Sequence, residues 1–324
     1  MRLAAVLIIT GLLAGCSAAP DTGQGWSFTD DRNETVSARE RPQRIIAQVS
    51  AAGALTDFGV KVTGTFGPLK KDDGTVEAEA GSVDPASVTD VTGGGYGELN
   101  LEKIAGLSPD LLVSGKYAEY AGLWHVTEEQ EKSVRKMVPT VGILQSGKAL
   151  PDTIARYRDL AKALGGDVDS ARVKADFDAF TKASDRIRSI GSRMRAENKT
   201  VLAVGGTTEG YFVAVPARAP DLAYYVSLGL PITTPANPDL PGGGYFERLS
   251  WENAGTYRPD VLLWDTRRAS NKPEEMKQHP VFAALPAAAA NRFVGWDAVA
   301  PMSYASYAKI MNRLADQLEI SLGR

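Results

Sequence analysis

Short apolar runs alternate with helix-like stretches along most of this chain. From residue 44 onward, each apolar run is bounded by turn residues and followed by a longer segment with apolar positions three and four residues apart. This alternation is typical of βα units, in which helices cover parallel strands. The predicted strands are 44–49, 60–65, 110–114 and 139–144 in the first half, and 200–204, 211–215, 260–265 and 292–296 in the second. The pattern predicts an α/β fold of two lobes with mainly parallel sheets.

A charged segment over residues 151–197 separates the two sets of strands and carries two helical stripes. The first helix begins at Pro151 and ends at Gly165. The second can be capped by Asp169 and repeats apolar residues at three- and four-residue steps up to Met194. Its roughly 29 residues would form a rod of roughly 43 Å, long enough to brace two lobes.

The length of the chain also favours two lobes, because 324 residues is about twice the usual size of one domain. We assign residues 42–150 to an N-terminal lobe and 198–302 to a C-terminal lobe. Residues 151–197 are the connecting helices, including the inter-lobe helix. Residues 303–324 hold a closing helix with Tyr307 on its apolar face. Tyr157, Tyr225 and Tyr307 lie on helical stripes and are predicted to pack.

The N-terminus has a different pattern. Arg2 precedes an apolar run of about 11 residues, whereas a helix needs about 20 to cross a bilayer, so residues 1–15 are predicted to be a signal peptide. The sequence LAGC at 13–16 resembles the bacterial lipobox, whose cysteine receives a diacylglyceryl group. Cys16 is then the lipid attachment site, and 16–41 form a tether and N-terminal segment. The protein is expected on the outer face of the cell membrane, with a Gram-positive source favoured over a periplasmic setting.

Composition narrows the function classes. Hydrophobic residues make up 44% of the chain and charged residues 23%, which excludes wholesale disorder and a multi-span membrane protein. A net charge of -3 gives no electrostatic reason to expect nucleic acid. One cysteine and two histidines exclude an internal disulfide and a Cys/His zinc site. His125 and His279 are expected to be solvated, on a loop and at a turn.

Three blocks of the first half recur in the second half. They are 93–98 and 242–247, 99–102 and 249–252, and 109–113 and 259–263, at offsets of 149, 150 and 150. Each copy predicts a glycine-rich loop, a short helix capped by Asn100 or Ser250, and a buried strand. The duplication places Glu102 and Glu252 at equivalent positions near a helix start, one in each lobe.

Together, the lipobox, the two Leu-x-x-Glu-(x)6-Pro-Asp-(apolar)3 blocks and the two long helices resemble the ferric-siderophore and vitamin B12 substrate-binding proteins of ABC importers. These are the helical-backbone, class III type of periplasmic binding protein. The resemblance covers about 42–322. It implies a monomer with no catalytic residues that binds its ligand between the lobes. It also implies that Glu102 and Glu252 dock onto arginines of a permease dimer, which works with its ATPase.

Ligands of such lobes bind beyond the carboxyl ends of the strands. The candidate ligand-binding residues near these ends are Phe66, Tyr96, Lys116, Tyr117, Tyr120, Trp124, Tyr211, Tyr245, Arg267, Arg268, Trp296 and Tyr304. In siderophore receptors of the resembled family, aromatic residues and arginine after these strands contact the ligand, and the match is best for Tyr117 and Tyr245. Many aromatics with one arginine pair favour a near-neutral ferric hydroxamate over an anionic catecholate.

Iron(III) is expected only inside its chelate, with no intrinsic cofactor, because two histidines cannot build a bare-metal site. Cobalamin or haem on the same fold is the alternative cargo. A lipid-anchored secreted hydrolase and a surface scaffold are the rival classes. The run 142–148 fits seven positions of a P-loop, but Ala149 stands where the magnesium-binding Ser or Thr belongs, and no G-x-S-x-G motif occurs.

Overall fold

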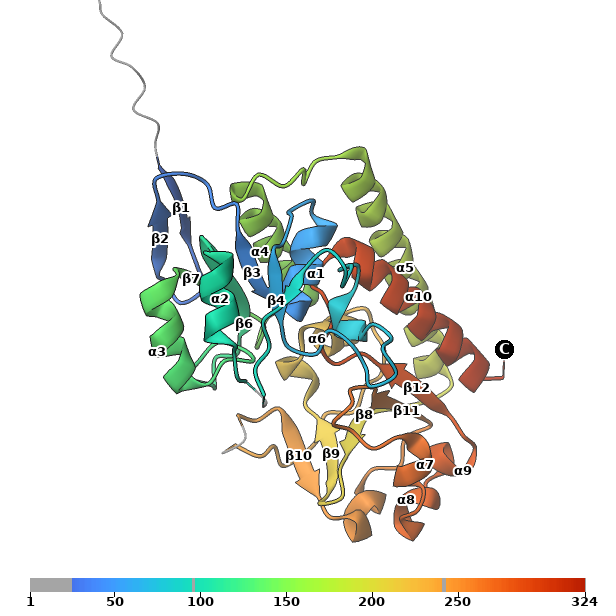
Figure 1. The fold of residues 1–324 in the computed structure, drawn as a ribbon. Helices are drawn as coiled ribbons and strands as arrows, with labels where there is room; N and C mark the ends of the chain where they lie inside the picture. Colours follow the sequence, from blue (N-terminus) through green and yellow to red (C-terminus); the bar gives the residue numbers. More distant parts are fainter. Residues whose placement is uncertain (1–24, 95–96, 241–242, 324) are drawn as a thin grey trace, which may run out of the picture.

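The N-terminal lobe is built on a five-stranded sheet in which every pairing is parallel (Figure 1). The structure is a computed structural model and describes residues 25–94, 97–240 and 243–323. The strand order is β5-β4-β3-β6-β7. The strands are β3 (Ile45–Gln48), β4 (Gly64–Phe66), β5 (Thr89–Asp90), β6 (Leu111–Lys116) and β7 (Thr140–Leu144). Their short lengths and β-branched, apolar sequences suit a sheet that helices cover on both faces.

The C-terminal lobe has a second five-stranded sheet of order β10-β9-β8-β11-β12. Its strands are β8 (Val201–Gly206), β9 (Tyr211–Ala214), β10 (Phe246–Leu249), β11 (Val261–Asp265) and β12 (Phe293–Trp296). β8, β11 and β12 pair in parallel, whereas β9 and β10 are antiparallel. The α/β fold with two mainly parallel sheets is therefore confirmed. The weak strands β5 and β10 were not predicted.

Each sheet has an outer helical layer of its own. In the N-terminal lobe this layer is α2 (Leu101–Leu107) and α3 (Glu128–Met137), and in the C-terminal lobe it is η3 (Trp251–Thr256), α7 (Pro273–Met276), α8 (Pro280–Ala283) and α9 (Pro286–Ala289). Alternate strand residues face these layers, as the two-residue period of a strand requires. Ile46 and Leu112 pack under the first outer layer, and Leu202 and Leu262 pack under the second.

The inner faces of both sheets share one hydrophobic core. Ile45 and Leu111 of the first sheet belong to the same buried cluster as Val201 and Val261 of the second. The helices that complete this cluster are α1 (Val49–Asp57), α4 (Leu150–Ala163), α5 (Ala171–Ala196), α6 (Pro220–Ser227) and α10 (Tyr304–Ser321). The 3-10 turns η1 (Ala78–Ala80) and η2 (Pro216–Arg218) lie at the ends of loops. The lobes are thus joined by continuous packing.

The helix α5 braces the two lobes, as its apolar stripe predicted. It has 26 residues, so it is about 39 Å long. Its cap is Ser170, whose side chain accepts a hydrogen bond from the Val173 N–H, and not Asp169. Helix α10 lies alongside α5 across both lobes (Figure 1). Glu319 of α10 pairs with Arg186 and Arg193 of α5 at 2.6 and 3.1 Å.

A hairpin of β1 (Trp26–Thr29) and β2 (Thr35–Ala38) lies beside β7, in a stretch where the sequence predicted no regular element. The Asp30 carboxylate at its turn accepts hydrogen bonds from the Gly142 N–H at 2.8 Å and from Arg32 Nε at 2.6 Å. Arg32 also donates to the Thr140 carbonyl at 2.6 Å. These buried polar contacts dock the hairpin. In the described part of the chain, every helix is too short or too polar to cross a bilayer.

Candidate functional site

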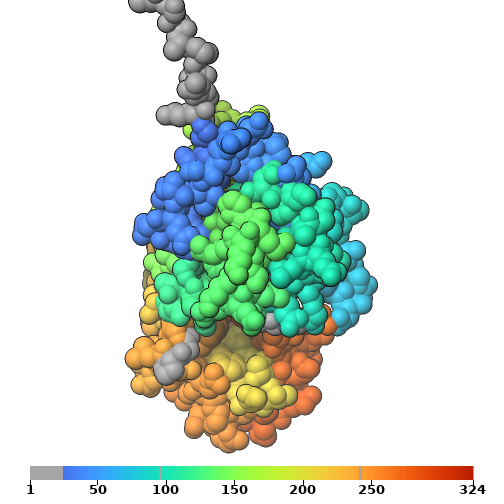
Figure 2. All heavy atoms as spheres, turned by 60° about the vertical axis from the view of Figure 1, so that its left-hand side comes forward, coloured from blue at the N-terminus to red at the C-terminus, as the bar shows by residue number. Residues whose placement is uncertain are grey.

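A cleft of about 820 Å³ lies between the lobes. The loops after β4, β5 and β6 line it on the N-terminal side, and the loops after β8, β11 and β12 line it on the other. The carboxyl ends of both sheets therefore face the same space, as the ligand-site rule for doubly wound sheets predicts. Figure 2 shows the recess where the two lobes meet.

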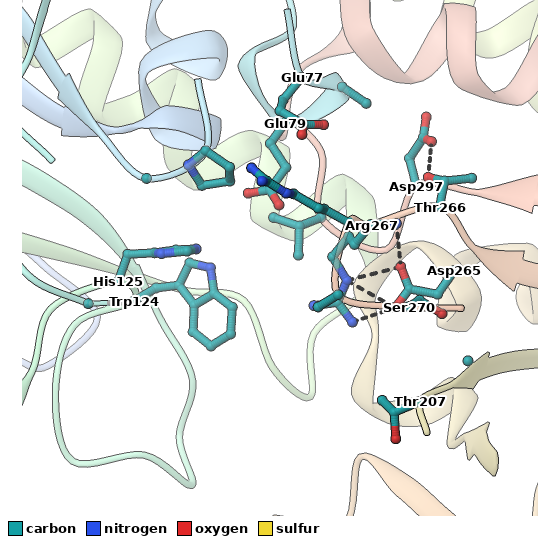
Figure 3. Close-up of a pocket in the computed structure, with 18 of the residues that line it drawn as sticks. Glu77, Glu79, Trp124, His125, Thr207, Asp265, Thr266, Arg267, Ser270 and Asp297 are labelled. Carbon is teal, nitrogen blue, oxygen red and sulfur yellow. Dashed lines mark hydrogen bonds and ion pairs between the residues drawn. The ribbon is translucent and has the colours of Figure 1, made fainter. Parts of the chain in front are cut away.

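Arg267 and Asp265 form the polar centre of the C-terminal wall (Figure 3). Asp265 ends β11, and its carboxylate accepts from Arg267 Nε at 3.0 Å and Nη2 at 2.6 Å. Burial would lower the pKa of Arg267, but the hydrogen bonds that it donates to the Asp265 carboxylate, together with the charge of that carboxylate, raise it above its ordinary value. The guanidinium is a fixed cation, and its Nη1 takes no part in the bonds to Asp265.

Trp124 and His125 supply the facing N-terminal wall. Their rings meet edge to face with centroids 5.2 Å apart. Burial, together with the Arg267 charge, lowers the pKa of His125 to about 4, so its imidazole is neutral near pH 7. The prediction of a solvated loop histidine was wrong for His125, because the loop after β6 folds back into the cleft. His279 is also not a free turn residue, since its ring stacks on Trp251 at 3.8 Å.

Two acidic residues that the sequence did not single out lie on the N-terminal side of the cleft. Glu77 is half-buried, and Glu79 on η1 is 9% exposed. Burial raises the pKa of the Glu79 carboxyl to about 8, although Arg267 across the cleft acts in the opposite direction. No predicted strand ends near these residues. Choosing candidates from the residues that follow each strand therefore could not identify them.

An aromatic cluster joins the lobes at one edge of the cleft. Tyr117 contacts Trp124 at 4.7 Å and Tyr245 of the C-terminal lobe at 5.7 Å between ring centroids. Tyr120 stacks on Tyr245 at 6.1 Å. Lys116 reaches only the Tyr120 carbonyl, with its Nζ donating at 2.9 Å. Of these five predicted ligand residues, Trp124 lines the main cavity and the other four are not among its lining residues.

Among the described residues, two ion pairs cross between the lobes. Glu119, in the loop after β6, accepts hydrogen bonds from Arg218 at 2.5 Å and from the Tyr245 hydroxyl at 2.5 Å. Arg268, a predicted ligand residue that lines the cleft, pairs with Asp72 of the N-terminal lobe. The second pair is much more exposed, with side chains 62% and 79% accessible. These two pairs therefore link the N-terminal and C-terminal lobes at two separate places.

Four of the predicted ligand residues lie in packed regions away from the cavity. Phe66 faces the outer layer of the first sheet, and Tyr211 packs on Trp251 and Phe282 at 5.7 and 5.4 Å. Trp296 donates its Nε1 hydrogen to buried Asp221 at 2.7 Å. Tyr304 is the first residue of α10, and its ring packs against Phe177 and Phe180 of α5.

The neighbours Phe212 and Phe246 line the cleft instead of Tyr211. They pair with ring centroids 6.1 Å apart on the antiparallel strands β9 and β10. Successive residues of a strand point to opposite faces, so one position separates a core residue from a cleft residue. The sequence did not predict β10, and therefore it did not show which face of β9 looks into the cleft.

Glu102 and Glu252 are both exposed, in the first turns of α2 and η3 on the outer layers. The Asn100 side chain accepts from the Lys103 N–H at 2.9 Å and caps α2 as predicted. The second copy is a 3-10 helix, and its Ser250 side chain makes no cap hydrogen bond. Backbone and Ser250 hydrogen bonds lower the pKa of Glu252, so this carboxylate is ionised near pH 7.

The remaining predicted residues, Cys16 and Tyr96, lie outside the described residues. Within residues 25–94, 97–240 and 243–323, no three His, Cys, Asp or Glu side chains converge as a set of metal ligands. The cleft is thus suited to binding an organic ligand through aromatic surfaces, a guanidinium and carboxylates.

Comparison with known proteins agrees with this geometry. A family model described as periplasmic binding protein matches residues 46–300. The ferric-siderophore receptor DesE from Streptomyces coelicolor is 32% identical, with a TM-score of 0.84 over 91% of this chain and 98% of that chain. A siderophore periplasmic binding protein from the fuscachelin gene cluster of Thermobifida fusca is 20% identical, with a TM-score of 0.59 over 86% and 96% of the two chains.

The iron uptake substrate-binding protein PiuA from Streptococcus pneumoniae is 17% identical, with a TM-score of 0.65 over 90% of this chain and 98% of that chain. At 20% and 17% identity, the Thermobifida and Streptococcus proteins show similarity of fold alone. A comparison with curated proteins found no match. The family match covers most of the chain, and the Streptomyces receptor is similar along nearly its whole length. The chain therefore belongs to the periplasmic-binding-protein family, whose members are extracytoplasmic substrate-binding proteins, as its sequence resemblance indicated.

Proposed function

We propose that this protein captures a ferric siderophore in the cleft between its lobes and delivers it to an ABC permease, without chemistry of its own. The observation that carries the proposal is the cleft of about 820 Å³, closed by aromatic rings and one fixed guanidinium at the carboxyl ends of both sheets. The similarity to a ferric-siderophore receptor supports the choice of cargo.

Charge in the cleft favours a hydroxamate over a catecholate. The lining carboxylates are Glu77, Glu79, Glu98, Asp265 and Asp297, and the lining guanidiniums are Arg267 and Arg268. Asp265 and Asp72 each pair with one of these arginines, so little positive charge is left for a strongly anionic ferric catecholate. A ferric hydroxamate is near neutral or weakly cationic and fits this balance.

Binding follows from the placement of these groups. Trp124 and the pair of Phe212 and Phe246 offer apolar surfaces to the organic arms of the chelate. Arg267 can donate from Nη1 to the oxygens that surround the iron. The siderophore itself fills the coordination sphere of the metal, so the protein contributes no iron ligand. The lipid at Cys16 holds the receptor at the membrane, and Glu102 and Glu252 orient it on the permease.

Titration of the purified protein tests the choice of cargo. We expect a ferrioxamine to quench tryptophan fluorescence with a submicromolar Kd, and a ferric catecholate and cobalamin to bind at least tenfold more weakly. The variant Trp124→Phe should keep most of the affinity and lose most of the quenching, because Trp124 is the tryptophan beside the cavity. The absence of any response to all three ligands at micromolar concentration contradicts the proposal.

The pair of Glu119 and Arg218 is expected to slow ligand release. We expect Glu119→Ala to raise the dissociation rate roughly threefold to tenfold, because a partly exposed charge pair with an added tyrosine hydrogen bond stabilises the closed cleft by about 1 kcal/mol. Stopped-flow fluorescence measures this rate. Asp72→Ala is the matched control, since it removes the exposed inter-lobe pair with Arg268 and should change the rate less than twofold. Equal rates in both variants would show that the Glu119 contact does not hold the cleft.

A further inference from the structure

Glu79 differs from the other buried carboxylates of the cleft. It is 9% exposed, lines the cavity, and its Oε2 has no hydrogen-bond partner among the described residues. Asp265 is bound by Arg267, and Asp297 accepts from Thr266 at 2.8 Å and pairs with Arg313. A buried carboxyl that lacks a partner is costly, so such a group in a binding cleft points to a partner that arrives with the ligand.

Charged and titratable groups face Glu79 from both walls of the cleft. Glu77 lies on the same segment, and Arg267 faces it from the C-terminal wall with Asp265 behind (Figure 3). Tyr117 interacts electrostatically with Glu79, and the neutral imidazole of His125, Glu98 and Arg268 line the same cavity. Asp265 balances Arg267 and Asp72 balances Arg268, so neither arginine that lines the cavity is left to neutralise an ionised Glu79.

We propose that Glu79 receives a protonated amine of the cargo, so that the cleft selects ferric hydroxamate chelates that carry a free cationic arm. This inference rests on the proposed function and refines its ligand class. In the bound state the ammonium donates to the Glu79 carboxylate, while the iron-bearing part of the chelate lies against Trp124 and Arg267. A charge-assisted hydrogen bond in a desolvated site is among the stronger single contacts that a ligand can make.

The proposal requires that binding releases a proton. Burial holds the pKa of Glu79 near 8 in the empty cleft, so the carboxyl is mostly protonated at pH 7. An alkyl ammonium has a pKa of about 10.4 and stays charged. Its approach stabilises the carboxylate and lowers the pKa of Glu79, and the carboxyl proton passes to the solvent. Affinity for the amine-bearing chelate should therefore rise as the pH increases toward 8, because in that range the carboxyl is protonated in the empty cleft and ionised in the complex.

Two ligands that differ only at the amine test the proposal. One is a ferrioxamine with a free terminal amine, and the other is the same chelate with that amine acetylated. We expect the wild-type protein to bind the first about 10- to 100-fold more tightly at pH 7.5, in keeping with a hydrogen bond between charged groups. Calorimetry in two buffers of different ionisation enthalpy should show release of up to about one proton at pH 7 with the amine, and none with the acetylated ligand.

Glu79→Gln should remove the preference and the proton release, so that the variant binds both chelates with similar affinity. Glutamine matches the shape of the protonated carboxyl, and binding of the acetylated chelate reports that the variant is folded. Glu128→Gln is the control, because it changes an exposed carboxylate of α3 outside the cavity and should keep the preference.

The outcomes separate this inference from the proposed function. If the wild-type protein binds neither ferrioxamine, the receptor function itself fails. If it binds both with equal affinity, or if Glu79→Gln keeps the preference for the amine, siderophore binding stands and the role of Glu79 is overturned. The comparison of the two ligands on the wild-type protein needs no substitution, so it holds even if a variant does not fold.

Discussion

Replacement of both Glu102 and Glu252 by alanine is expected to abolish uptake of the ferric siderophore, while the purified protein keeps its ligand affinity. Both carboxylates are exposed in the first turns of α2 and η3, and neither lines the cleft. Paired contacts to two halves of a permease would fix the orientation of the receptor, so loss of both should reduce uptake by at least 100-fold. Uptake of iron-labelled siderophore by cells and fluorescence titration of the purified protein measure the two properties separately.

Matched controls use exposed carboxylates of the same outer layers. Glu128 of α3 and Glu274 of α7 are also exposed, and their double replacement by alanine removes the same charge. Uptake should then stay within about twofold of the wild type, since surface charges away from a contact contribute little. If the Glu102 and Glu252 variant loses ligand affinity instead, these residues act in the cleft. Undiminished uptake would refute the docking role.

Cys16→Ala is expected to release the protein from the membrane fraction into the medium or the soluble extracytoplasmic fraction. Each acyl chain gains about 0.8 kcal/mol per buried CH₂, and two chains make the attachment stable. Labelling cells with a radioactive fatty acid measures the change directly, because Cys16 is the single cysteine of the chain. Ligand affinity should not change, since the described residues that line the cleft begin at Gly67. Ser17→Ala serves as the control, and a Cys16→Ala protein that still incorporates the labelled fatty acid would contradict lipid attachment at Cys16.

The parts of the fold that rest on strong local patterns were predicted from the sequence. Continuous apolar runs located β3, β6, β7, β8, β11 and β12, because strands buried on both faces need them. The helical stripes assigned Tyr157, Tyr225 and Tyr307 to packing, and all three are fully buried. The repeat predicted the cap of α2 at Asn100.

The other features depend on contacts between residues far apart in the sequence. The hairpin at 26–38 has no sustained apolar pattern and is held by Arg32 and Asp30 against β7, more than a hundred residues away. Glu79 became a cleft residue only because the loop after β4 returns over the carboxyl ends of the sheet. The same limit explains why Tyr211 was singled out where Phe212 lines the cavity, since pairing with β10 fixes the face of β9.

Under the proposed function, the hydrophobic core shared by the two lobes affects how empty and loaded receptors compete for the permease. Because packing runs without a break from the first sheet through α5 and α10 to the second, the spacing between Glu102 and Glu252 is preset by the fold. Empty and loaded receptors would then offer the permease nearly the same footprint. An empty receptor would occupy the transporter as a competitive inhibitor of a loaded one. The number of receptor copies for each permease would therefore govern the rate of import as strongly as the affinity for the siderophore.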